Sequence, residues 1–196
     1  MSKRQQLKEQ RRRQSRVSNL VWGAGLLILV AIVGYFIWNS LSTAATSITS
    51  PVGQVMPVGS DRGHITDGSD PGPYSTNPPT SGHHYPTWLD AKFYDTNTYT
   101  YPQGYLVHNL EHGYIIFWYN CKSLSDSECS EMKTQIKGVM DAVGNFKVIA
   151  YPWDSIENPI VMTSWGFTLP FQKFDPAMAR AFVDQHRNKA PEPEAP

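Results

Sequence analysis

The C-terminal half of the chain contains three short runs of β-branched and aromatic residues. Such side chains favour extended backbone, and a strand that is covered on both faces is continuously apolar rather than alternating. Each run also has the length of an ordinary strand. The pattern therefore predicts strands at residues 114–119, 146–151 and 160–165.

Two other stretches have the periodicity of helices. Apolar residues recur three and four positions apart over residues 132–143, and Asp126 or Ser127 precedes them as a helix cap. Further along, Asp175 is followed by a proline, which is the pattern of a cap and a first helical residue. We expect this last helix to run to about Asn188.

Residues 60–105 combine many prolines and glycines with many aromatic side chains. The prolines and glycines argue against regular helix over more than a turn, whereas the aromatic residues are too numerous for a disordered linker. We expect a long ordered loop wrapped over the core. The sequence thus predicts one α+β domain over residues 60–188, with a small, mainly antiparallel sheet, two helices and this loop, followed by a disordered tail at residues 189–196.

The N-terminal region has the pattern of a membrane anchor. Residues 20–38 carry no charge, and nineteen residues are close to the ~20 that cross a bilayer as a helix. Residues 1–19 carry seven Lys or Arg and one Glu, which favours a cytoplasmic head and an extracytoplasmic domain, periplasmic or at the cell surface. Residues 39–59 are expected to be a flexible linker. A cleaved signal peptide is the alternative, although its apolar stretch is usually shorter.

The formal net charge of zero hides an uneven distribution. The basic residues gather in the head, so the chain after residue 19 carries ten Lys or Arg against sixteen Asp or Glu. Attraction to anionic lipid explains the basic head, and the acidic body would repel phosphate groups. We therefore expect the lipid bilayer, and no nucleic acid, as a partner.

The two cysteines of the chain are Cys121 and Cys129. In an oxidising extracytoplasmic compartment, two cysteines at this separation favour a local disulfide. A thiolate metal site is the alternative, but the chain has no second cysteine pair and no C-x-x-C spacing.

A motif with the chemistry of a metal site lies just before the first predicted strand. His108 and His112 are four residues apart with Glu111 between them, so both imidazoles fall on one side of a helical turn or face each other across a tight turn. Either geometry brings two nitrogen atoms to one metal ion.

Other histidines lie on the turn-rich segment, where loops can deliver side chains to one point. They are His64 and the adjacent His83 and His84. Imidazole nitrogen is a ligand for both zinc and copper, and three or four such side chains make a site. The predicted metal ligands are His64, His84, His108 and His112.

Several blocks of this sequence match a known signature. They are Asn-Pro-Pro-Thr-Ser-Gly-His-His-Tyr-Pro at 77–86, Val-His-Asn-Leu-Glu-His-Gly at 107–113, Tyr-Pro at 151–152 and Ser-Trp-Gly at 164–166. In these blocks the chain resembles the bacterial domain-of-unknown-function family 3105, from about residue 63 to residue 187. The resemblance implies an N-terminal anchor, an extracytoplasmic domain and a shared site at the four histidines named above, and it implies no particular reaction.

The resemblance also bears on the two adjacent histidines. The family usually has proline at the position of His83, so the match favours His84 as the residue that faces the site.

We expect a membrane-anchored protein that binds copper or zinc and serves a neighbouring membrane complex. The alternative is a non-catalytic accessory subunit of such a complex, in which the histidines form a structural polar cluster. A third function is zinc-dependent hydrolysis, because His108, Glu111 and His112 spell the H-x-x-E-H motif. That mechanism needs a long helix around the motif, and none is expected, so we expect Glu111 to orient an imidazole instead.

Overall fold

The computed structural model describes residues 51–60 and 62–196. Its elements, in chain order, are β1 (Gln54–Val55), α2 (Pro102–Glu111), β2 (Ile115–Tyr119), α3 (Asp126–Ala142), β3 (Val148–Pro152), β4 (Ile160–Ser164), β5 (Phe167–Phe171) and α4 (Pro176–His186). Within these residues, no helix has the length and apolar character that a bilayer crossing requires. The predicted head at 1–19, the predicted span at 20–38 and most of the predicted linker lie outside the described residues.

The strands form one mixed sheet in the order β1-β5-β4-β2-β3. Three of its four pairings are antiparallel, and β2 pairs with β3 in parallel, with Ile115 opposite Val148. A parallel pair cannot be joined by a hairpin, and α3 supplies the crossover between these two strands. The predicted α+β domain is therefore confirmed, and the three predicted strands lie within two residues of β2, β3 and β4.

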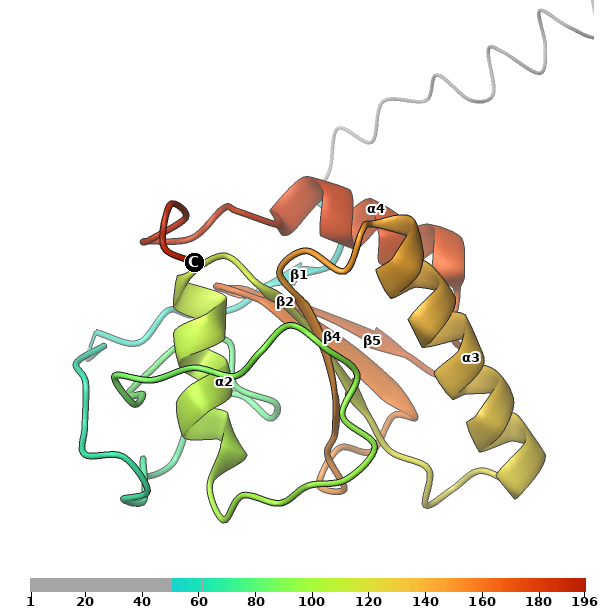
Figure 1. The fold of residues 1–196 in the computed structure, drawn as a ribbon, viewed down its shortest axis with the longest axis horizontal. Helices are drawn as coiled ribbons and strands as arrows, with labels where there is room; N and C mark the ends of the chain where they lie inside the picture. The colour runs from blue at the N-terminus through green and yellow to red at the C-terminus, as the bar shows by residue number, and fades with distance from the viewer. Residues whose placement is uncertain (1–50, 61) are drawn as a thin grey trace, which may run out of the picture. The chain divides into compact units, whose positions relative to one another are not determined.

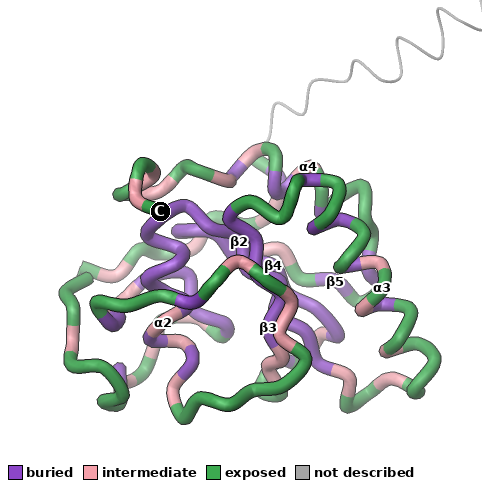
Figure 2. Tube along the Cα trace, viewed as in Figure 1, coloured by how far each residue is buried: buried purple, intermediate pink, exposed green. Residues whose placement is uncertain are grey.

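Helices cover both faces of the sheet (Figure 1). On one face, α3 and α4 pack against alternate residues of β2 such as Ile115 and Phe117. On the other face, α2 packs against the residues between them, Ile116 and Trp118. Every residue of β2 is therefore buried, which explains its continuous apolar run, and Figure 2 shows the central strands buried beneath exposed loops.

The helix α3 begins with a capping box. The Ser125 hydroxyl accepts a hydrogen bond from the main-chain N–H of Glu128, and the Glu128 carboxylate accepts one from the N–H of Ser125. The cap thus lies one residue before the earlier of the two predicted caps. The disulfide between Cys121 and Cys129, eight residues apart, ties the start of α3 to the end of β2, and it confirms the predicted pairing.

The helix α2 was not predicted, and the expectation of no helix around His108 is wrong. The prolines and glycines up to residue 104 indicated a loop. Pro102, however, stands in the first turn of α2, where a main-chain N–H has no partner within the helix, so the missing N–H of proline costs no helical hydrogen bond. Gly104 is required by packing, because a Cβ atom there would lie 2.4 Å from the ring of Tyr85. The strands β1 and β5 were also not predicted, since Pro170 interrupts the apolar pattern of β5.

The long loop before α2 is fixed to the strand ends at several points. The Asn77 amide oxygen accepts a hydrogen bond from the indole N–H of Trp153, at 2.8 Å, and its amide nitrogen donates to the main-chain oxygen of Ser155. The main-chain N–H of Gly166 donates to the oxygen of Thr80. These contacts join the block 77–86 to the block 164–166 and to residues 153–155, which follow the block 151–152.

Residues 188–196, referred to below as the C-terminal segment, make hydrogen bonds with the rest of the domain. The main-chain N–H of Asn188 donates to the oxygen of Gly113, and that of Glu192 donates to the oxygen of Glu111. Lys147 donates to two further main-chain oxygens of this segment. These hydrogen bonds hold the residues that the sequence predicted as a disordered tail against the domain, and Figure 1 marks the C-terminus beside the end of α2.

Candidate functional site

The last turn of α2 carries the histidine motif into the core. His108 and Glu111 lie on this turn and His112 is the residue that ends the helix. All three are at most 9% exposed, which is unusual for polar side chains of this kind. A buried polar group is costly unless it has a partner, so the contacts of these side chains determine what the site can do.

An amide pair holds the preceding loop against α2. The Asn109 side chain, which is fully buried, accepts a hydrogen bond from the N–H of Leu89 and donates one to its oxygen, at 3.0 and 2.8 Å. This reciprocal pair fixes the neighbouring Trp88, whose ring centroid lies 5.4 Å from that of His108 and 5.0 Å from that of His112. Trp88 is 41% exposed, so its ring lies at the surface beside the buried rings of His108 and His112.

The loop delivers two more histidines to the same place. His64 and His84 are joined by a β-bridge, in which the N–H of Ile65 donates to the oxygen of His84 at 2.8 Å. The ring of His64 stacks on that of His108, with centroids 5.1 Å apart and planes 1° from parallel. Ligand atoms of His64, His84 and His108 all lie within 4.8 Å of one another.

Main-chain oxygens set the tautomers of three of these rings. The Nδ1 atom of His84 lies 2.8 Å from the oxygen of Gly82, that of His108 lies against the oxygen of Tyr85, and that of His112 lies 3.0 Å from the oxygen of Pro196. A main-chain oxygen only accepts hydrogen bonds, so each Nδ1 carries the proton and donates. In the neutral ring, each Nε2 atom is then left with an unprotonated lone pair.

These Nε2 atoms face other lone pairs. The Nε2 atoms of His108 and His112 are 2.8 Å apart, and the Nε2 atom of His84 is 2.8 Å from a carboxylate oxygen of Glu111. The contact between His84 and Glu111 is close but is not aligned as a hydrogen bond, and His84 Nε2 is buried with no hydrogen-bond partner. Without a proton or a cation between them, these pairs of acceptors repel each other.

The surroundings disfavour a proton at His108. Burial lowers the pKa of His108 to about 4. The hydrogen bond to Tyr85 opposes this shift, and the neighbouring imidazoles of His112, His84 and His64 add to it, because each would repel a second positive charge. His108 is therefore neutral at pH 7.

The comparison with protein families matches residues 67–196 to the family described as "protein of unknown function (DUF3105)". The chain belongs to the DUF3105 family. This confirms the resemblance drawn from the sequence blocks, and the matched region extends through the C-terminal segment, whereas it begins three residues after His64. The comparisons with curated proteins and with solved structures give no match.

In this DUF3105 domain, the structure brings the predicted ligands together in two groups that share His108. His64, His84 and His108 form one group, and His112 contacts His108. Of the two adjacent histidines, His84 points into the site, whereas the Nδ1 atom of His83 lies 3.4 Å from the oxygen of Gly63. Glu111 contacts an imidazole, as expected, and that imidazole is His84.

Some residues of the site were not predicted. They are Trp88, Asn109 and Glu192, and the last has a carboxylate oxygen 3.6 Å from the Nε2 atom of His112. Asn109 stands inside the histidine motif, so its position was a signal that could have been used. Glu192 stands in a stretch of Pro, Glu and Ala, and nothing in that composition distinguishes it.

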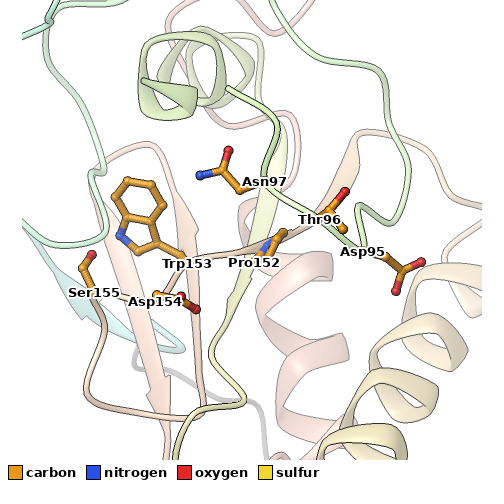
Figure 3. Close-up of a pocket in the computed structure, with 7 residues that line it drawn as sticks. All are labelled: Asp95, Thr96, Asn97, Pro152, Trp153, Asp154 and Ser155. Carbon is orange, nitrogen blue, oxygen red and sulfur yellow. The ribbon is translucent and has the colours of Figure 1, made fainter. Parts of the chain in front are cut away.

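A hollow lies at the other end of the parallel strands from the histidines (Figure 3). It has a volume of about 440 Å³ and is lined by Asp95, Thr96, Asn97, Pro152, Trp153, Asp154 and Ser155. Its two carboxylates are each paired with a lysine, Asp95 with Lys133 at 3.5 Å and Asp154 with Lys122 at 3.2 Å. Because each carboxylate already has a lysine partner, this hollow is a weaker candidate for binding a cation than the histidine site, where lone pairs face one another.

Proposed function

We propose that this protein binds a divalent transition metal, zinc or copper, through His64, His84, His108 and His112. The observation that supports it most directly is the 2.8 Å separation of the Nε2 atoms of His108 and His112, both of which carry lone pairs. A metal ion between two such atoms converts a repulsion into two bonds. Ligating histidines in proteins usually donate their other ring N–H to a main-chain oxygen or a carboxylate, and three rings of this site do so.

The types of donor atom favour these two metals. The site offers imidazole nitrogens and the carboxylate of Glu111, which suit zinc and copper in their divalent states. Within the described residues both cysteines are joined in the disulfide, so no thiolate is available to favour monovalent copper. For two ligand atoms bonded tetrahedrally at ~2.1 Å, the separation is about 3.4 Å, so the two rings would move apart slightly on binding.

A structural histidine cluster without metal is the second candidate. It is favoured by the contact of His84 with Glu111, because a protonated His84 beside this carboxylate would be a buried ion pair. In that case the domain would act as an accessory subunit of a membrane complex, and the histidines would contribute only to stability.

Hydrolysis would need more than the motif provides. The H-x-x-E-H sequence occupies the final turn of α2, so the helix does not continue beyond it. Glu111 lies against His84, which suits a role in orienting this ring. We therefore propose binding, and not catalysis, as the function of the site.

We also propose that residues 20–38 anchor the protein in a membrane, with the domain on the extracytoplasmic side beside a membrane complex. The disulfide supports this placement, because disulfides persist in oxidising compartments.

Elemental analysis of the full chain, purified in detergent without a histidine tag, tests metal binding. We expect close to one equivalent of zinc or copper in the parent protein and none in the His108→Ala/His112→Ala variant. A parent that binds no metal after loading with Zn²⁺ or Cu²⁺, or one that binds more weakly than millimolar, would favour the structural cluster. Circular dichroism of both proteins separates loss of the site from loss of the fold.

A further inference from the structure

We propose that the C-terminal segment closes the metal site, with Glu192 as an additional metal ligand and Pro196 as the residue that orients His112. This inference rests on the proposed metal binding. It assigns a role to residues that stand about 80 positions from the histidine motif in the sequence, and its first support is the way in which they are held against the end of α2.

The end of a helix leaves main-chain oxygens without partners inside the helix. The main-chain oxygens of Glu111, His112 and Gly113 follow one another at the end of α2. The C-terminal segment donates hydrogen bonds to the first and the last of them. Glu111 receives the N–H of Glu192 and Gly113 receives the N–H of Asn188, both at 3.0 Å. The segment therefore supplies hydrogen-bond donors to the turn that carries the histidines.

Lys147 joins the end of α2 to the C-terminal segment. Its ammonium group donates to the oxygen of His112 at 2.9 Å, and to the oxygens of Pro193 and Ala195 at 2.8 and 2.7 Å. An ammonium group has three protons, so all of them are used. The side chain is buried, and burial lowers its pKa, which is tolerated because every proton has an acceptor.

Close approach at Gly113 shows how tightly the segment is packed. A Cβ atom at this position would lie 2.7 Å from the Cα atom of Asn188. The backbone also has φ = +83° at Gly113, which favours glycine. The chain thus reaches the start of β2 in a conformation that leaves room for the segment.

Two groups of the segment then reach His112. The main-chain oxygen of Pro196 accepts the hydrogen bond from Nδ1, which directs the lone pair of Nε2 toward the site. A carboxylate oxygen of Glu192 lies 3.6 Å from Nε2. This is close to the separation of about 3.4 Å between two atoms that share one tetrahedral metal ion. The Glu192 side chain is 60% exposed, so it can adjust its position on binding.

The test compares two glutamates of the same segment in the full chain. Glu192→Gln removes the proposed ligand. Glu194→Gln makes the same change in charge two residues away, at an exposed side chain whose carboxylate acts on Lys147 and forms no ion pair with the histidines of the described residues. We expect competition against a chelator to give a Zn²⁺ affinity at least tenfold weaker for Glu192→Gln, and changed by less than twofold for Glu194→Gln. A third variant lacking residues 190–196 should lose at least as much affinity as Glu192→Gln.

The visible absorption of bound Co²⁺ separates a ligand from a structural residue. We expect the spectrum to change in Glu192→Gln and to remain that of the parent in Glu194→Gln. Equal affinities and equal spectra in both variants, with full binding by the protein lacking residues 190–196, would overturn the role of the segment. If the parent binds metal and His108→Ala/His112→Ala does not, that result overturns only the role of the segment and not the metal site. A parent that binds no metal overturns both proposals.

Discussion

The Nε2 atom of His84 is fully buried 2.8 Å from a carboxylate oxygen of Glu111, without the alignment of a hydrogen bond. A proton on His84 or a metal ion would each relieve this contact. The two explanations differ in what they predict for substitutions at this histidine and at its neighbour.

Replacement of His84 by alanine should weaken Zn²⁺ binding by at least tenfold, because one imidazole ligand is lost. His83→Ala is the matched control, since His83 is adjacent, of the same type, and turned toward the oxygen of Gly63. Chelator competition on both variants measures the difference. Similar affinities in the two variants would mean that His84 is not a ligand.

Two helical glycines should respond to alanine in opposite directions. In Gly104→Ala the added Cβ would lie 2.4 Å from the Tyr85 ring, so we expect the free energy of unfolding to fall by about 1–3 kcal/mol. In Gly138→Ala, within α3, no atom lies within 4 Å of the added Cβ, so we expect a gain of roughly 0.5–1 kcal/mol. Chemical denaturation measures both.

Gly104→Ala should also weaken metal binding, because the main-chain oxygen of Tyr85 holds the ring of His108. Gly138→Ala should leave the metal affinity unchanged. An affinity that falls in Gly104→Ala and rises in Gly138→Ala, in step with the free energy of unfolding, would indicate that the site responds to general stability and not to the packing of Tyr85.

The domain should lose stability as the pH falls from about 6.5. Burial lowers the pKa of His186, its hydrogen bond to the oxygen of Val52 raises it, and Lys189 lowers it, with a net decrease. Below the pKa that His186 has in the unfolded chain, the unfolded state binds the proton more readily than the folded state. The free energy of unfolding therefore falls as acid is added. Above about pH 6.5 the contribution is complete.

Denaturation in the presence of a chelator between pH 5 and 7.5 measures this dependence. One such histidine contributes at most about 1.4 kcal/mol per pH unit. The His186→Gln variant should show a shallower slope than the parent, because the amide can donate to Val52 but does not titrate. An unchanged slope would show that His186 is not among the groups responsible.

Removal of the disulfide should lower the free energy of unfolding by about 2 kcal/mol, because the eight-residue separation of Cys121 and Cys129 constrains the unfolded chain. Cys121→Ser/Cys129→Ser should still bind metal, since neither cysteine contacts the histidines in the described structure. Calorimetric melting with and without reductant provides the measurement, and the variant should no longer respond to reductant.

Much of the sheet could be predicted from the sequence, because β2, β3 and β4 are short apolar runs between clear breaks. The helix α2 could not, since its first residues, Pro102 and Gly104, usually interrupt helices. Here the proline occupies the first turn and the glycine admits the Tyr85 ring, so both residues serve packing that only the tertiary structure reveals.

The sequence predicted the histidines of the candidate site but not the groups that hold their rings in place. His108 and His112 have a spacing that brings two rings together in a helix, whatever surrounds them. The hydrogen-bond acceptors of the rings are main-chain oxygens, which every residue has, so no side chain marked them in the sequence. Glu192 has the same limitation, because its position depends on how Lys147 holds the C-terminal segment.

The sheet that contains the buried strand β2 separates two apolar layers of the domain, one on each face. The helix α2 with its histidines packs in the layer that includes Ile116, and α3 and α4 pack in the layer that includes Phe117. The loop before α2 contributes to both layers, because Leu89 packs in the first and Phe93 in the second. A ligand held by the first layer alone slows its local opening far more than that of the second. Amide exchange in α2 should therefore slow on addition of metal, while exchange in α3 keeps its rate.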